Sequence, residues 1–162
     1  MNWPLAFRAY LFLGLIEAAA AMAAFFFVLN RAGWTYGETL GARDPVYLQA
    51  TTACLSTIIV MQIVNVFLCR SAIRSVFSTG LLGNALIIWG VVLEIVSLLL
   101  INYAPWVNSL LGTAPVEAAV WGLVIPLAAG MFILEELRKW SARRRLLKRS
   151  PRSGARSVLQ VR

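Results

Sequence analysis

Four apolar stretches of about twenty residues each dominate the hydrophobic pattern of the chain, and shorter polar segments separate them. A helix that crosses a bilayer needs about 20 mostly apolar residues, so each stretch predicts one membrane span. The predicted spans cover residues 10–29, 49–68, 86–103 and 118–137. The pattern therefore predicts an all-α membrane protein, a bundle of four transmembrane helices within residues 10–145.

The segments between these stretches have the composition of loops. Glycine and proline are frequent in residues 30–47, 69–85 and 104–117. Pro126 lies inside the fourth span, where we expect a kink whose freed backbone carbonyl a neighbouring helix or water satisfies. The first span contains Glu17 and is followed by no clear cleavage signal, so it predicts a retained helix rather than a signal peptide.

Composition supports a membrane location and concentrates the charge in one place. The chain of 162 residues is 60% hydrophobic and 14% charged, whereas soluble domains are about 25% charged. The net charge of +8 arises mainly after the fourth span, since residues 138–162 hold ten Lys or Arg and no acid. Residues 146–162 predict a basic, disordered tail. Such a tail suits two roles, binding of anionic lipid headgroups or a purely topogenic signal.

The distribution of Lys and Arg among the short connections predicts the orientation in the membrane. Basic residues flank the first span at Arg8, occur in the second connection at Arg70 and Arg74, and follow the fourth span, while the third connection has none. Arg31 and Arg43 in the first connection oppose this bias. By the positive-inside rule, the flank 1–9 and the C-terminus lie in the cytoplasm. We expect a multi-pass protein of a bacterial inner membrane.

Polar side chains within the predicted spans are the candidates for chemistry, because hydrocarbon penalises each of them. Gln62 and Asn65 are three residues apart and share one helix face with Cys69. Glu94 lies in the third span and Glu17 in the first. Their oxygens suit a cation or proton site. The alternative is that the amides join helices by hydrogen bonds and that Glu94 stays uncharged.

Two further carboxylates, Glu135 and Glu136, lie at the end of the fourth span. Basic residues follow them directly, beginning with Arg138. We expect ion pairs between these groups at the cytoplasmic surface. They are therefore candidates for structural pairing rather than for cation transport.

Several classes of function are excluded by what the sequence lacks. It has no His, and its two cysteines, Cys54 and Cys69, lie in one predicted helix about 22 Å apart. A zinc-type metal site and a disulfide between them are thus excluded. No phosphate-binding loop, catalytic pair or folded extramembrane domain is present. We expect no nucleic-acid binding, no cofactor held by this chain and no enzymatic activity of the chain alone.

A series of short motifs, in order along the chain, resembles a known family. Residues 65–77 read NVFLCRSAIRSVF, and Tyr103-Ala104-Pro105 ends the third span. Gly112-Thr113-Ala114-Pro115 follows, and Leu134-Glu135-Glu136-Leu137-Arg138-Lys139 closes the fourth span. Together, residues 3–145 resemble the C-terminal membrane region of cation-transporting P-type ATPases, of the calcium or sodium/potassium pump type.

The resemblance implies that the chain corresponds to the last four of the ten helices of such a pump. It also implies roles for individual residues. Gln62 matches a position that is Glu in calcium pumps and Gln in sodium/potassium pumps. Asn65 matches Asn in the former and Asp in the latter, and Glu94 matches a carboxylate near an additional sodium site. Glu17 falls near a polar position of the family's seventh helix. The resemblance thus implies coordination of a monovalent cation or calcium in a full assembly.

The resemblance also implies missing parts. The chain lacks the DKTGT phosphorylation motif, the nucleotide-binding domain and the first six pump helices. We therefore expect a truncated or split-gene product that acts with a separate chain carrying those parts. Two alternatives remain open from the sequence: a small proton-coupled cation or drug antiporter that uses Glu17, and a structural or regulatory membrane subunit.

Overall fold

The computed structural model describes residues 13–70 and 84–149, and the described parts are helices joined by short loops. Their order is α2 (Gly14–Arg31), α3 (Pro45–Leu68), α5 (Ala85–Tyr103), α6 (Pro105–Leu111) and α7 (Ala118–Arg149). Four of them are long and apolar enough to cross a membrane: α2, α3, α5 and the Ala118–Arg145 part of α7. The predicted all-α bundle of four candidate spans is confirmed.

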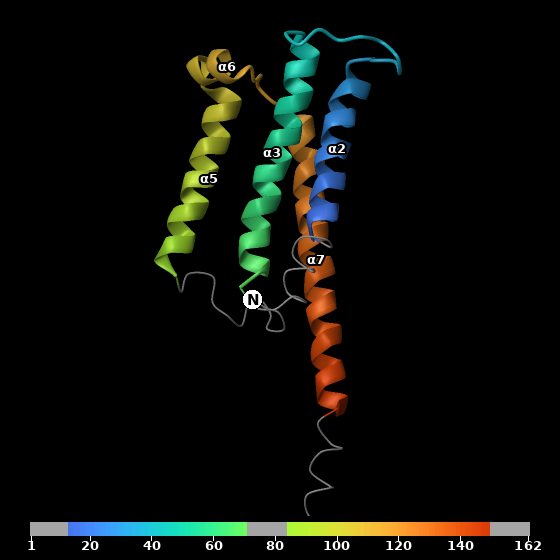
Figure 1. The fold of residues 1–162 in the computed structure, drawn as a ribbon, viewed down its shortest axis with the longest axis vertical. Coiled ribbons are helices and arrows are strands. Elements are labelled where there is room, and N and C mark those ends of the chain that lie inside the picture. Colours follow the sequence, from blue (N-terminus) through green and yellow to red (C-terminus); the bar gives the residue numbers. More distant parts are fainter. Residues whose placement is uncertain (1–12, 71–83, 150–162) are drawn as a thin grey trace, which may run out of the picture.

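The four long helices run alternately up and down, and they are not equally packed (Figure 1). Helices α2 and α3 form the most extensive pair, and α7 packs against both. Helix α5 packs chiefly against α3 and α6, so it stands at one side of the bundle. Most of its side chains are not covered by other described residues, including Leu93 and Leu99.

Small side chains allow the close approach of α2, α3 and α7. One core cluster contains Ala24 of α2 together with Ala50 and Ala53 of α3, and it includes Val120 and Val124 of α7. Without a hydrophobic driving force in lipid, close backbone packing through small residues is a principal source of helix association. A second cluster, nearer the C-terminal end of α3, is formed by larger side chains such as Leu13, Met61 and Met131.

Among the described helix ends, the structure differs from the expected bounds by more than two residues in three places. Helix α3 starts at Pro45 rather than at residue 49, because Asp44 Oδ1 accepts a hydrogen bond from Val46 N at 2.8 Å and caps it. The expected loop 104–117 contains the short helix α6, which begins at Pro105 and ends at Leu111, followed by Gly112 in the left-handed conformation. Glycine adopts that conformation without steric cost.

The third difference concerns α7, which was expected to end at residue 137 and instead continues to Arg149. The backbone stays helical through Pro126 and for roughly three turns beyond the expected end. The expected tail 146–162 therefore begins within a helix. Its part beyond residue 149, the flank 1–9, the start of the first span at Tyr10 and most of the connection 69–85 lie outside the described residues.

Candidate functional site

Glu17 of α2 and Gln62 of α3 meet across the tightest helix pair. Gln62 Nε2 donates to Glu17 Oε1 at 2.7 Å. The Glu17 side chain is buried, whereas Gln62 remains exposed at the surface of the bundle. The sequence marked both residues separately, and the structure makes them one polar pair within the spanning part of the bundle.

Asn65 lies about one turn beyond Gln62, and its side-chain hydrogen bond is a local one to the residue that follows α3. Cys69 Sγ donates to Asn65 Oδ1 at 3.1 Å, which agrees with the predicted common face of these two residues. Asn65 is half-buried. The hydrogen bond occupies one lone pair of the amide oxygen, and the second remains available to another donor or to a cation.

Glu94 is the candidate on α5, and it has an unsatisfied atom. Its Oε2 is buried and has no hydrogen-bond partner among the described residues. No hydrogen bond joins it to Gln62 or to Asn65 in this part of the chain, so the structure does not bring the four predicted oxygen donors into a single described cluster. An unpaired carboxylate oxygen in hydrocarbon requires a proton, a water molecule or a cation.

A polar contact between α3 and α5 was not foreseen from the sequence. Asn102 is fully buried, and its Nδ2 donates to Ser56 Oγ and to the Leu98 carbonyl, each at 2.8 Å. These bonds fix the orientation of the amide and leave Asn102 Oδ1 without a donor among the described residues. The sequence signal for this contact is an asparagine near the end of a mostly apolar span.

The loop before α7 is tied to the bundle beside this contact. Thr52 Oγ1 donates to Leu48 O at 2.6 Å and accepts from Ala114 N at 2.9 Å. Gln49 Nε2 donates to Pro115 O at 3.1 Å. On the same end of the bundle, Arg31 and Glu117 form an exposed ion pair of 3.6 Å, which contributes little to stability.

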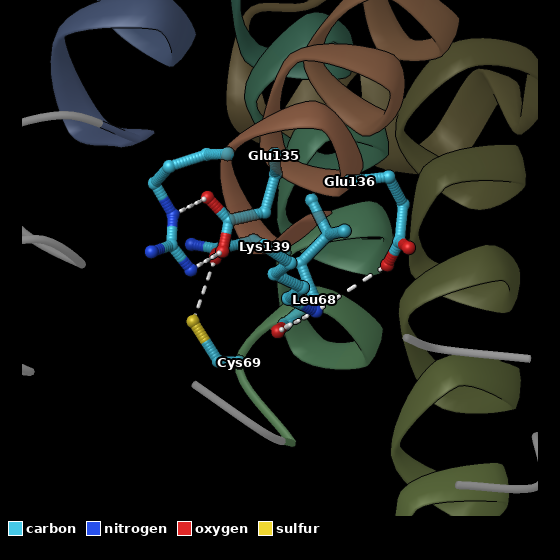
Figure 2. Close-up of polar contacts among 7 residues, drawn as sticks. Leu68, Cys69, Glu135, Glu136 and Lys139 are labelled. Carbon is cyan, nitrogen blue, oxygen red and sulfur yellow. Dashed lines mark hydrogen bonds and ion pairs between the residues drawn. The ribbon is translucent and has the colours of Figure 1, made fainter. Parts of the chain in front are cut away.

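The opposite end of the bundle holds a cluster of charged side chains on α7 (Figure 2). Arg138 binds the buried Glu135 in a bidentate manner, with Nε at 2.7 Å from Oε2 and the second nitrogen at 2.9 Å from Oε1. Lys139 lies 3.6 Å from Glu136. Glu135 and Glu136 thus each lie beside a cation one turn further along α7.

Lys139 has a second contact that the sequence did not indicate. It is completely buried, and its Nζ donates to the carbonyl oxygen of Leu68, the last residue of α3, at 2.9 Å. Figure 2 shows the Cys69 side chain pointing toward the Glu135 carboxylate beside this contact. The charged turn of α7 thus holds the C-terminal end of α3.

The donor set determines which ligands the bundle suits. Within residues 13–70 and 84–149 no three His, Cys, Asp or Glu side chains come together in a way that would hold a metal ion. The oxygens of Glu17, Gln62, Asn65 and Glu94 are hard ligands, which fit alkali or alkaline-earth cations better than transition metals. Their assignment as cation ligands stays a prediction.

Comparison with known proteins identifies the family. The pattern of the family described as "Cation transporting ATPase, C-terminus" matches residues 1–141. The chain is 33% identical over 86 residues to the probable cation-transporting ATPase F of Mycobacterium tuberculosis (strain ATCC 25618 / H37Rv), an alignment that covers 53% of the chain and 10% of that protein.

Two longer alignments are with animal proteins. Identity is 27% over 168 residues with the sodium/potassium-transporting ATPase subunit alpha of Drosophila melanogaster, covering 89% of the chain and 16% of the relative. It is 26% over 163 residues with the human potassium-transporting ATPase alpha chain 2, covering 86% and 16% respectively. The chain thus spans no more than about a sixth of the length of these relatives. The chain belongs to the family of cation-transporting ATPase C-termini.

Proposed function

We propose that this chain forms the C-terminal membrane domain of a cation pump and contributes oxygen ligands to the path of the cation. The ATP-hydrolysing domains and the remaining spanning helices are supplied from outside these residues, by a separate chain in a split pump or by a further part of one polypeptide. Glu17, Gln62, Asn65 and Glu94 are the proposed ligands. The transported ion is a monovalent cation or calcium.

The observation that supports this proposal most is the exposure of Gln62. The side chain lies within a membrane-spanning helix and is bonded to Glu17, yet it reaches the surface of the described bundle. A polar amide exposed to lipid is unfavourable, so such groups normally face a protein interior or a cavity. Additional helices packed on this face would enclose Gln62 and complete a polar path.

Glu94 supports the same proposal from a second helix. Its orphaned carboxylate oxygen lies on α5, which other described helices cover least. The Glu94 oxygen, which has no partner among the described residues, and the exposed Gln62 amide lie on different helices, and a shared cation site requires oxygens from several helices. The family membership favours this function over a stand-alone antiporter, an alternative that rested only on the carboxylate of Glu17.

The proposal includes an orientation with the C-terminal end of α7 in the cytoplasm. The cations of α7 from Arg138 onward lie at the end of the bundle where α3 terminates. The positive-inside rule places such a cluster on the cytoplasmic side. In a bacterium the membrane would be the inner membrane.

The test is complementation of an incomplete pump. The full-length chain is co-expressed with a cation-transporting ATPase that lacks its last four helices, and ATP-driven uptake of calcium, sodium and rubidium is measured in inverted vesicles. Uptake is expected to be restored, to fall after Gln62→Leu or Glu94→Gln, and to persist after Leu93→Ala, an apolar substitution at an exposed position of α5. Correct insertion of the chain without restored transport and without co-purification would contradict the proposal.

A further inference from the structure

A cavity of about 210 Å³ lies where α2 ends and α3 begins, at the end of the bundle opposite the charged turn of α7. Its wall includes the aromatic side chains of Phe25, Phe26, Trp34 and Tyr47, and one acidic residue, Glu38. Three of its lining residues, Trp34, Glu38 and Leu40, belong to the connection between α2 and α3. None of these residues belongs to the proposed cation path, which runs through Gln62 and Glu94.

The aromatic rings are held in fixed relative positions. The Phe25 ring meets the Tyr47 ring at 88° with centroids 6.4 Å apart, and the Phe26 ring at 85° with centroids 5.5 Å apart. Trp34 is anchored because its indole Nε1 donates to the Glu38 carbonyl at 3.0 Å. These contacts fix the positions of the rings that line the cavity, and the π faces of aromatic rings attract cations.

Glu38 adds a negative charge that the described chain does not neutralise. Its carboxylate accepts long hydrogen bonds from Thr35 only, at 3.3 Å from the backbone nitrogen and 3.5 Å from the hydroxyl. Within the described ranges no Lys or Arg lies within ion-pair distance of it. Arg31, at the end of α2, is paired with Glu117 and lies over the Phe27 ring. The cavity therefore combines aromatic walls with an uncompensated carboxylate.

We propose that this cavity binds an alkylammonium group, quaternary or protonated. A soft organic cation suits aromatic faces that would not strip the water from a small metal ion, and Glu38 supplies the opposite charge. A purely apolar ligand would gain nothing from the carboxylate. Because the cavity lies at the end of two spanning helices, the group is either the headgroup of a phospholipid or a soluble amine.

The experiment compares choline with its neutral carbon isostere, dimethylbutanol, which has the same shape and no charge. The full-length chain is reconstituted in nanodiscs of phosphatidylglycerol, which has no ammonium group, and each compound is titrated by calorimetry. Choline is expected to bind about tenfold more tightly than the isostere, which corresponds to the attraction of a partly desolvated cation to aromatic faces. Equal binding of the two, or no binding of choline, overturns the proposal.

Substitutions locate the site. Glu38→Gln keeps the shape of the side chain and removes its charge, and Trp34→Leu removes one aromatic wall, so each is expected to weaken choline binding several-fold. Glu117→Gln is the matched control, because Glu117 is an exposed carboxylate at the same end of the bundle that does not line the cavity. An effect of Glu117→Gln as large as that of Glu38→Gln overturns the assignment.

The lipid composition distinguishes the two sources of the cation. If the occupant is a lipid headgroup, nanodiscs of phosphatidylcholine abolish the binding of added choline that phosphatidylglycerol nanodiscs allow. If it is a soluble amine, added choline binds equally in both. Either result supports the alkylammonium site. Glu38 is exposed, so we expect the Glu38→Gln variant to fold. Its choline binding therefore tests the proposal even if the Trp34→Leu variant fails to fold.

Discussion

Lys139 Nζ lies 2.9 Å from the carbonyl oxygen of Leu68, so a fully buried ammonium on α7 caps the C-terminal end of α3. The last carbonyls of a helix have no partner within the helix, and the negative end of its dipole favours a cation there. The contact joins two spans that are seventy-one residues apart in the sequence.

Replacing Lys139 by Met should lower the stability of the bundle. The substitution removes the donor to the Leu68 carbonyl, and an unsatisfied buried group costs about 1–3 kcal/mol. Unfolding in mixed micelles measures the change. Arg145→Met, at an exposed position of the same helix, is the control and should have little effect. Equal losses in the two variants would contradict a capping role for Lys139.

Glu135→Gln should be more damaging than Glu136→Gln. Glu135 is buried and holds Arg138 through two short bonds, whereas Glu136 is partly exposed and 3.6 Å from its cation. Glu135→Gln removes the charge that both bonds to Arg138 depend on, and hydrogen bonds to charged groups are the stronger ones, so we expect a loss of about 2 kcal/mol. Thermal unfolding of the two purified variants provides the comparison, and the reverse order would refute the assignment.

Gln62→Leu should weaken the α2–α3 pair only modestly. Hydrogen bonds between spanning helices contribute about 0.6–2 kcal/mol, and the substitution removes the 2.7 Å bond to Glu17. Ile58→Leu, one turn earlier on the same exposed side of α3, is the matched control. A loss of stability far above this range would mean that Gln62 has further partners within the chain. In the assembled pump, we expect transport to fall much more than stability does.

Asn102→Ala should separate α5 from α3. The change removes the donors to Ser56 and Leu98 in a fully buried position, and we expect a loss of about 1–3 kcal/mol. Ser56→Ala removes only the acceptor on α3 and should cost less. Crosslinking of engineered cysteine pairs across the α3–α5 interface follows the separation directly. Undiminished crosslinking in Asn102→Ala would show that apolar packing alone holds α5.

The orientation is tested with fusions. A fluorescent protein attached after Arg162 should fluoresce in bacterial cells, and alkaline phosphatase inserted at Gly41 or Gly112 should be active outside the inner membrane. These results follow from the cations on α7 and in the second connection, which resist translocation. Active phosphatase at the C-terminus would reverse the proposed topology.

The sequence alone determined the helical class, the number of spans and the ionic pairing at the end of α7. These properties are local or compositional: twenty consecutive apolar residues admit no other stable element in lipid, and Glu135 and Arg138 lie three residues apart on one helix. The resemblance of residues 3–145 to cation pumps agreed with the family match over residues 1–141. The ends of the helices were predicted less well from the sequence. The cap at Asp44 and the continuation of α7 beyond residue 137 depend on local backbone geometry, which a hydropathy pattern does not report.

Only the tertiary structure decided which polar groups meet. Glu17 and Gln62, Ser56 and Asn102, and Lys139 and Leu68 are each pairs from different helices. Their contact depends on the rotation and depth of one helix against another, and these are set by the packing of small side chains such as Ala24 and Ala53. A hydrophobic pattern gives the length of a span and leaves its rotation open. The sequence therefore marked Gln62 and Lys139 as polar residues, while their partners emerged from the packing.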